Sequence, residues 1–237
     1  MKRFNFILFS FIMIPLTETL AQNQQLTPEL LWKMGRVALD CVSPDGQSAV
    51  YGVTRYDVPS NKSSRALYLV NVQSGETRLL TDPEKTSSDA EFQPDGKKLG
   101  FLRDGRQYEI NTSGPGEAVK VNDLEMNGFH YAPDGQHILF VQDVKLDKTL
   151  PELNPDLPKA SGRAFDGLMY RHWKSWHDYA YSNVFFVGYK DGKFSSTPVN
   201  IQNERFDTPL TPDGGMEQIA WSPDSRWIIY TDRKSTR

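Results

Sequence analysis

The sequence predicts an all-β protein, a partial β-propeller of four-stranded antiparallel blades. A Pro-Asp turn motif occurs four times, and successive copies lie 50, 39 and 90 residues apart. A short strand pattern precedes each copy and a more apolar one follows it. Blade repeats run at about 40 to 50 residues, and four short strands make one blade. The chain should therefore hold about three and a half blades.

The repeated motif has the composition of a tight hairpin turn. Proline fixes φ at the second position of a type I turn, aspartate bonds the local backbone, and glycine takes the left-handed position that follows. The fourth copy has Ser225 in place of glycine, which fits that position less well. The copies are Ser43-Pro44-Asp45-Gly46, Gln93-Pro94-Asp95-Gly96, Ala132-Pro133-Asp134-Gly135 and Ser222-Pro223-Asp224-Ser225. We interpret the four aspartates as structural.

The 90-residue spacing allows two interpretations: two blades with one turn motif lost, or one blade with an insertion at about 145–180. The segment 147–159 has three prolines and no strand pattern. Beyond it, residues 184–189 and the turn at 190–192 supply the missing outer hairpin. These features favour the insertion.

The N-terminal residues predict an export signal. Residues 1–21 join a basic start to an apolar run at 4–14 that is too short for a membrane span, which needs about 20 residues. Cleavage is expected after Ala21, and the mature chain is expected to be periplasmic or secreted, with no membrane attachment. Residues 22–36 form a lead-in element, in which Thr27 caps a short helix with Pro28 at its first position. The incomplete propeller then takes residues 37–237.

Composition excludes several classes of function. The chain is 38% hydrophobic and 24% charged with a net charge of −3, as in ordinary soluble proteins. It lacks the basic block that a nucleic-acid partner requires. Its single cysteine, Cys41, cannot form an internal disulfide.

Catalytic and cofactor motifs are also missing from the sequence. There is no Gly-x-Ser-x-Gly nucleophile elbow, phosphate loop, dinucleotide fingerprint or His-Glu-x-x-His helix. His172 and His177 would diverge on a helix, while His130 and His137 flank one hairpin. We therefore expect no catalytic residue, no cofactor and no metal in this chain.

One segment, 168–179, departs from the blade pattern because it combines aromatic rings with cations inside the insertion. Such rings can line a recognition pocket. The alternative is that the large rings merely cover a blade face. The candidate substrate-binding residues are Tyr170, Arg171, His172, Trp173 and Trp176.

Four features in chain order resemble a known family: the leader, the lead-in segment 26–32, the first turn motif Ser43-Pro44-Asp45-Gly46 and the insertion segment 162–173. The mature chain resembles the N-terminal region of exported bacterial serine peptidases of the prolyl oligopeptidase family. The nearest branch is that of dipeptidyl peptidase 5 and acylaminoacyl peptidases. The turn motifs alone also occur in TolB-like propellers.

The resemblance implies a non-catalytic, substrate-gating propeller in a secreted exopeptidase that acts on peptide N-termini. A C-terminal α/β-hydrolase domain, absent from this chain, would carry the Ser-Asp-His triad, and the full-length protein could form a homodimer. Family members often have an acidic residue after the His-Trp pair, where this chain has Lys174 and Ser175; Asp166 and Asp178 could substitute for it. The alternative is a TolB-like periplasmic propeller that binds proteins.

Overall fold

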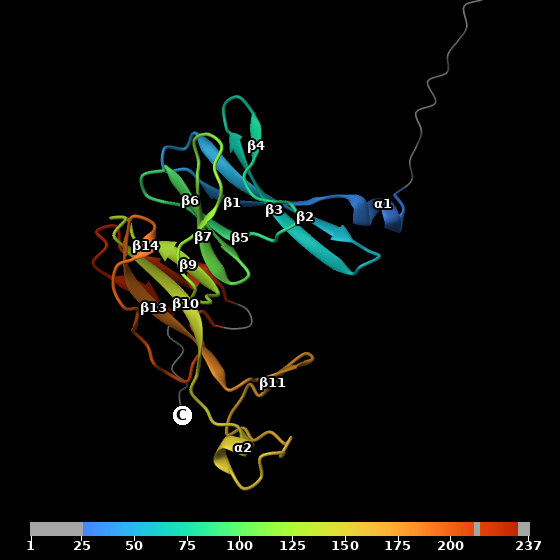
Figure 1. Ribbon diagram of the computed structural model, residues 1–237, viewed down its shortest axis with the longest axis vertical. Coiled ribbons are helices and arrows are strands. Elements are labelled where there is room, and N and C mark those ends of the chain that lie inside the picture. Colours follow the sequence, from blue (N-terminus) through green and yellow to red (C-terminus); the bar gives the residue numbers. More distant parts are fainter. Residues whose placement is uncertain (1–25, 211–213, 232–237) are drawn as a thin grey trace, which may run out of the picture.

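The computed structural model describes residues 26–210 and 214–231, which form successive antiparallel sheets (Figure 1). Three sheets of four or five strands are followed by a two-stranded hairpin. The first strands of the first three sheets lie next to one another in chain order, as in adjacent propeller blades. The predicted fold class, all-β with propeller blades, is confirmed.

Each sheet follows the simple up-and-down order expected of a blade. Blade 1 has the order β1-β2-β3-β4 and blade 2 the order β5-β6-β7-β8. Blade 3 has the order β9-β10-β13-β14, with β15 also paired to β13. The strands are β1 Arg36–Val42, β2 Ser48–Asp57, β3 Lys62–Asn71, β4 Thr77–Leu79, β5 Ser88–Phe92, β6 Lys98–Arg103, β7 Arg106–Asn111, β8 Val119–Lys120, β9 Gly128–Tyr131, β10 His137–Lys145, β13 Ala180–Lys190, β14 Lys193–Phe194 and β15 Val199–Asn200. The last hairpin is β16 Ile219–Trp221 with β17 Ile228–Tyr230, preceded by the 3-10 turn η1 Met216–Gln218.

The four Pro-Asp motifs are the turns between the first and second strands of each blade. In each, the N–H of the last residue donates to the carbonyl of the first at 2.8–2.9 Å. The aspartate carboxylate accepts a backbone N–H two residues on, at 2.8–3.2 Å. Ser225 adopts a φ of 60°, close to the 68–71° of the three glycines. The structural interpretation of the aspartates is confirmed.

The long spacing is an insertion within blade 3, as the sequence favours. Strand β10 pairs with β13 without interruption, from His137 opposite Gly188 to Lys145 opposite Ala180. Residues 146–179 therefore leave the sheet at one end and return to it at the same point. They contain helix α2 (Leu150–Leu153) and the hairpin of β11 (Arg171–His172) and β12 (Ser175–Trp176), which extend away from the blades in Figure 1.

The lead-in element is a helix of six residues, α1 (Pro28–Lys33). The Thr27 hydroxyl caps it by accepting the N–H of Leu30 at 3.2 Å, as predicted. The helix buries none of its residues, although Trp32 packs edge-on against Tyr56 of β2. The predicted signal segment lies outside the described residues. Within the part of the chain that the structure describes, no helix has the length and apolarity needed to cross a membrane.

The hydrophobic core lies between the blades. Three buried clusters fill the three interfaces between successive sheets. Phe101 and Leu99 are fully buried between blades 1 and 2, and Phe140 and Ile138 between blades 2 and 3. By contrast, β1 leaves Val37 and Leu39 about two-thirds exposed, at 68% and 66%. Each blade is therefore stabilised by its neighbour.

Candidate functional site

The insertion leaves blade 3 at the end opposite to the Pro-Asp turns. In an antiparallel blade the turn after the second strand lies at the far end from the turn before it, so β10 delivers the insertion to that end. The hairpin of β11 and β12 has a two-residue turn, Trp173-Lys174, and Trp173 adopts a φ of 50°. A positive φ suits a two-residue hairpin turn. It places Trp173 at the tip, 86% exposed.

Phe165 is the centre of an aromatic cluster within the insertion. Its ring stacks on Tyr179 at 5.3 Å and lies within 3° of parallel to Trp176 at 6.2 Å. Tyr170 stacks on both Phe165 and Trp176, and the His177 ring meets Phe165 edge-on. Offset ring pairs at these separations are favourable beyond the area they bury. The cluster holds the loop 161–170 against the β11–β12 hairpin.

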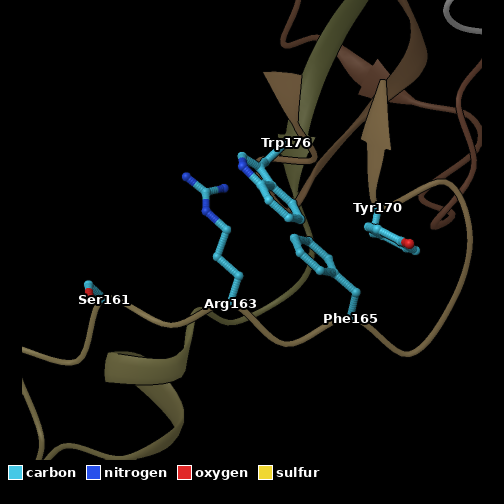
Figure 2. A pocket seen from close by; sticks show the side chains of 5 residues that line it. All are labelled: Ser161, Arg163, Phe165, Tyr170 and Trp176. Atoms are coloured by element: carbon cyan, nitrogen blue, oxygen red, sulfur yellow. The ribbon is translucent and has the colours of Figure 1, made fainter. Parts of the chain in front are cut away.

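An open hollow of about 540 Å³ lies on this cluster, lined by Ser161, Arg163, Phe165, Tyr170 and Trp176. Figure 2 shows the Arg163 side chain extending from the loop alongside the Trp176 ring, with Phe165 next to that ring. One guanidinium nitrogen of Arg163 donates to the carbonyl of His177 at 3.2 Å. The hollow therefore combines flat aromatic walls with one cation.

The predicted site residues divide into two groups. Tyr170 and Trp176 line the hollow, and the Arg171 guanidinium lies over the Trp176 ring at 5.1 Å from its centroid. His172 and Trp173 contact each other at the hairpin tip, apart from the lining. Tyr170, Trp173 and Trp176 stay 46%, 86% and 45% exposed, and the ring contacts that they make lie within the insertion.

The two candidate acidic substitutes do not line the hollow. Asp166 is exposed in the loop, and the Asp178 carboxylate accepts the N–H of Ala180 at 3.1 Å. The sequence prediction also missed Ser161, Arg163 and Phe165. They lie outside the dense aromatic segment 168–179, and only the chain path back from α2 brings them to it.

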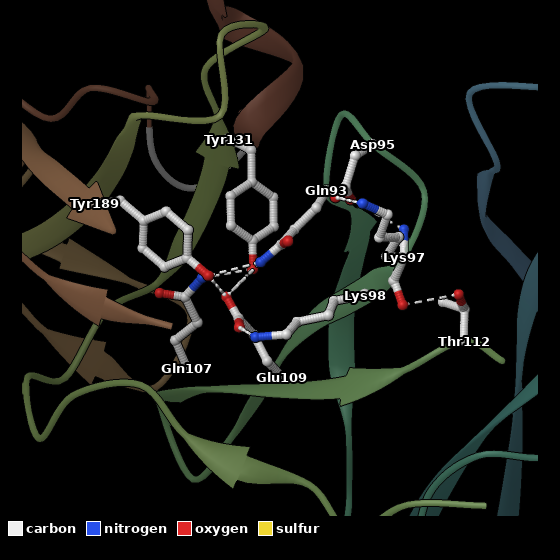
Figure 3. A network of polar contacts seen from close by, with 9 residues as sticks. All are labelled: Gln93, Asp95, Lys97, Lys98, Gln107, Glu109, Thr112, Tyr131 and Tyr189. Carbon is white, nitrogen blue, oxygen red and sulfur yellow. Dashed lines mark hydrogen bonds and ion pairs between the residues drawn. The ribbon is translucent and has the colours of Figure 1, made fainter. Parts of the chain in front are cut away.

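A second cluster, which is polar, lies between blades 2 and 3 and is centred on Glu109 of β7 (Figure 3). The Glu109 side chain is 3% exposed. Its carboxylate accepts hydrogen bonds from the hydroxyls of Tyr131 and Tyr189 and from the Lys98 ammonium, the last at 3.2 Å. Burial, followed by the nearby Glu109, raises the pKa of Tyr131, so its hydroxyl stays protonated and donates. The cluster is enclosed and holds two blades together.

A third cluster joins three blades near their first strands. His130 of β9 contacts the Glu91 carboxylate of β5 at 2.6 Å, and its other ring nitrogen lies 3.1 Å from the carbonyl of Met216. Burial by itself lowers the pKa of His130, but the hydrogen bond and charge of Glu91 outweigh it and raise that pKa above 6.5. Among the described residues, no three His, Cys, Asp or Glu side chains gather closely enough to hold a metal ion.

The His130–Glu91 contact predicts a pH-dependent stability. The pKa of His130 is higher in the folded state than in the unfolded state. The His130–Glu91 pair therefore contributes fully to the free energy of unfolding below about pH 6.5, and this contribution is lost as the pH rises through the folded pKa. The loss should be about 1 kcal/mol, because the pair is only partly buried. Urea unfolding from pH 5.5 to 8.5 measures it. His130→Gln should remove this component of the pH dependence, and an unchanged profile in that variant would contradict the assignment.

Comparison with known proteins finds sequence similarity to peptidases. It is 33% identical to dipeptidyl-peptidase 5 of Porphyromonas gingivalis over 90% of its length, and 29% identical to that of Porphyromonas endodontalis over 93%. The chain spans about a third of the length of these relatives, 32% in both. No family model matches the chain.

Solved structures agree on the fold. Acylaminoacyl peptidase of Pyrococcus horikoshii superposes with a TM-score of 0.54 at 14% identity, over 72% of this chain and 26% of that one. TolB of Acinetobacter baumannii gives 0.51 at 13% identity, over 86% and 39%. The blades and the relatives together support a propeller module similar to the propeller portion of peptidases. The chain is similar to a propeller portion of the peptidases named dipeptidyl-peptidase 5, as the resemblance predicted.

Proposed function

We propose that this chain is the substrate-gating propeller part of a secreted serine exopeptidase, and that its insertion contacts the peptide to be cleaved. The observation that carries the proposal is the hollow on the Phe165 cluster, an open aromatic surface on the insertion that leaves blade 3. Its relatives are named dipeptidyl-peptidases, which favours peptide over a protein-binding role of the TolB kind. Catalysis would belong to an α/β-hydrolase domain acting with this propeller.

A peptide-binding assay tests the recognition role. The probe is a short phenylalanine-containing peptide with a neutral fluorophore, followed by fluorescence anisotropy with the full chain. Trp176→Ala should weaken binding about tenfold, because it removes one wall of the hollow. Trp32→Ala is the matched control, since Trp32 is equally exposed at 45% and also has an aromatic partner, but lies on α1. Equal binding by Trp176→Ala and the unaltered chain would refute the role.

Two further measurements test the remaining parts of the proposal. The chain alone should not hydrolyse dipeptidyl p-nitroanilides, since none of its residues matches the family triad, and measurable turnover would overturn the non-catalytic assignment. N-terminal sequencing of the protein recovered outside the cytoplasm should begin at Gln22. A mature protein that still begins at Met1 would contradict the proposed export.

A further inference from the structure

We propose that the hollow on the Phe165 cluster recognises a carboxylate next to an apolar side chain in the bound peptide, rather than a free ammonium group. The inference rests on the proposed function and gives its substrate a chemical class. It derives from the charge of the hollow, from the guanidinium groups around it and from the flatness of its walls.

The lining of the hollow is cationic. Arg163 is its one charged residue, and no carboxylate belongs to it. An ammonium group would meet a like charge here with no acceptor of opposite charge, which disfavours binding. The two nearest acids in sequence give no such acceptor, because Asp178 is engaged by the N–H of Ala180 and Asp166 lies outside the lining. The hollow therefore selects against the charge of a peptide N-terminus.

The Arg163 guanidinium has donors to spare. A guanidinium has five N–H donors in a planar fork, and Arg163 gives one hydrogen bond, to the carbonyl of His177. No ion pair joins Arg163 to an acid within residues 26–210 and 214–231. A guanidinium that has one donor engaged and its other N–H donors free can bind a carboxylate through two parallel hydrogen bonds.

A second guanidinium strengthens the same preference. Arg171 lies over the Trp176 ring at 5.1 Å, and its Nε donates to the carbonyl of Trp173 at 3.1 Å. Trp176 thus has Arg171 over its ring. Arg163 lies beside Trp176 at the hollow (Figure 2). The remaining walls, Phe165 and Tyr170, are flat rings that suit an aliphatic or aromatic side chain. The ligand that matches all of these groups is an apolar residue adjacent to a carboxylate.

The carboxylate could come from an acidic side chain or from a peptide C-terminus, and four peptides separate these sources. Each contains phenylalanine and a neutral fluorophore. The first ends in glutamate with an amidated terminus, the second in amidated glutamine, the third in glutamine with a free carboxylate, and the fourth in amidated lysine. At least one carboxylate peptide should bind the full chain about tenfold more tightly than amidated glutamine, as for a charge-assisted hydrogen bond. The lysine peptide should bind most weakly, and the tighter carboxylate peptide identifies the source.

Arg163→Gln should abolish the difference between the carboxylate and amide peptides. Arg163→Lys keeps the charge without the planar fork and should retain only part of it. Arg226→Gln is the matched control, because it removes the same charge from an exposed arginine in the fourth Pro-Asp turn and should leave the difference intact. Equal affinities for all four peptides, or a preference for lysine, would overturn this inference. If binding is nonetheless lost in Trp176→Ala, the proposed peptide-recognition role survives; if no peptide responds to Trp176→Ala, that role fails as well.

Discussion

Glu109→Ala should lower the free energy of unfolding by about 3 kcal/mol, the largest stability loss that we expect from a single polar substitution in this chain. The substitution removes the acceptor shared by Tyr131, Tyr189 and Lys98 at the interface of blades 2 and 3. The Tyr131 hydroxyl would then lose its acceptor, because the side-chain amide of Gln107, at 3.2 Å, donates to that hydroxyl. Buried donors without acceptors lose their hydration and gain nothing in return. Equilibrium urea unfolding measures the change.

Two further variants serve as controls for Glu109→Ala. Glu109→Gln keeps the shape and one acceptor oxygen, so its loss should be smaller than that of the alanine variant. Glu125→Ala removes an exposed partner of Arg106, 73% accessible to solvent, and should cost less than about 1 kcal/mol. If Glu109→Ala were no more destabilising than Glu125→Ala, the interface between blades 2 and 3 would depend on its apolar contacts alone.

The sequence predicts the blades because their determinants are local. A Pro-Asp-Gly turn and its flanking strands are contained in about 15 residues, and each was found where the motif indicates, including the poorer copy at Ser225. The insertion was also predictable, because prolines and the loss of alternation mark it in the sequence. The Glu109 cluster gave no such signal. Glu109 and Tyr189 are 80 residues apart, and nothing in either local pattern indicates that the two blades meet there.

The candidate site was partly predictable from the sequence, less so than the blades and more so than the Glu109 cluster. Tyr170 and Trp176 were predicted from a local excess of aromatic residues, and both line the hollow. Arg163 and Phe165 were missed, because a single arginine and a single phenylalanine in a loop have no periodicity to distinguish them. Their positions depend on how the chain returns from α2 to β11, a path that side-chain stacking determines rather than backbone propensity.

Phe165→Ala should weaken binding of the phenylalanine peptide at least tenfold while changing the stability of the blades by less than about 1 kcal/mol. Phe165 contacts Tyr170, Trp176 and Tyr179 at once, so its removal both opens a gap and frees the loop that carries Arg163. Its neighbours lie almost entirely within the insertion, which leaves the sheet pairing of β10 with β13 intact. Anisotropy measures the first effect and urea unfolding the second.

Phe194→Ala should have the opposite effect to Phe165→Ala, lowering stability without changing peptide affinity. Phe194 of β14 stacks on the buried Phe140 at 5.9 Å and packs against the core between blades 2 and 3. Its loss should reduce stability by about 2 kcal/mol and leave peptide affinity unchanged under conditions where the chain remains folded. Opposite behaviour of the two phenylalanines would establish that the insertion recognises ligand independently of the blades that hold it. If both variants instead lost affinity and stability together, the walls of the hollow would depend on the same packing that holds the sheets together.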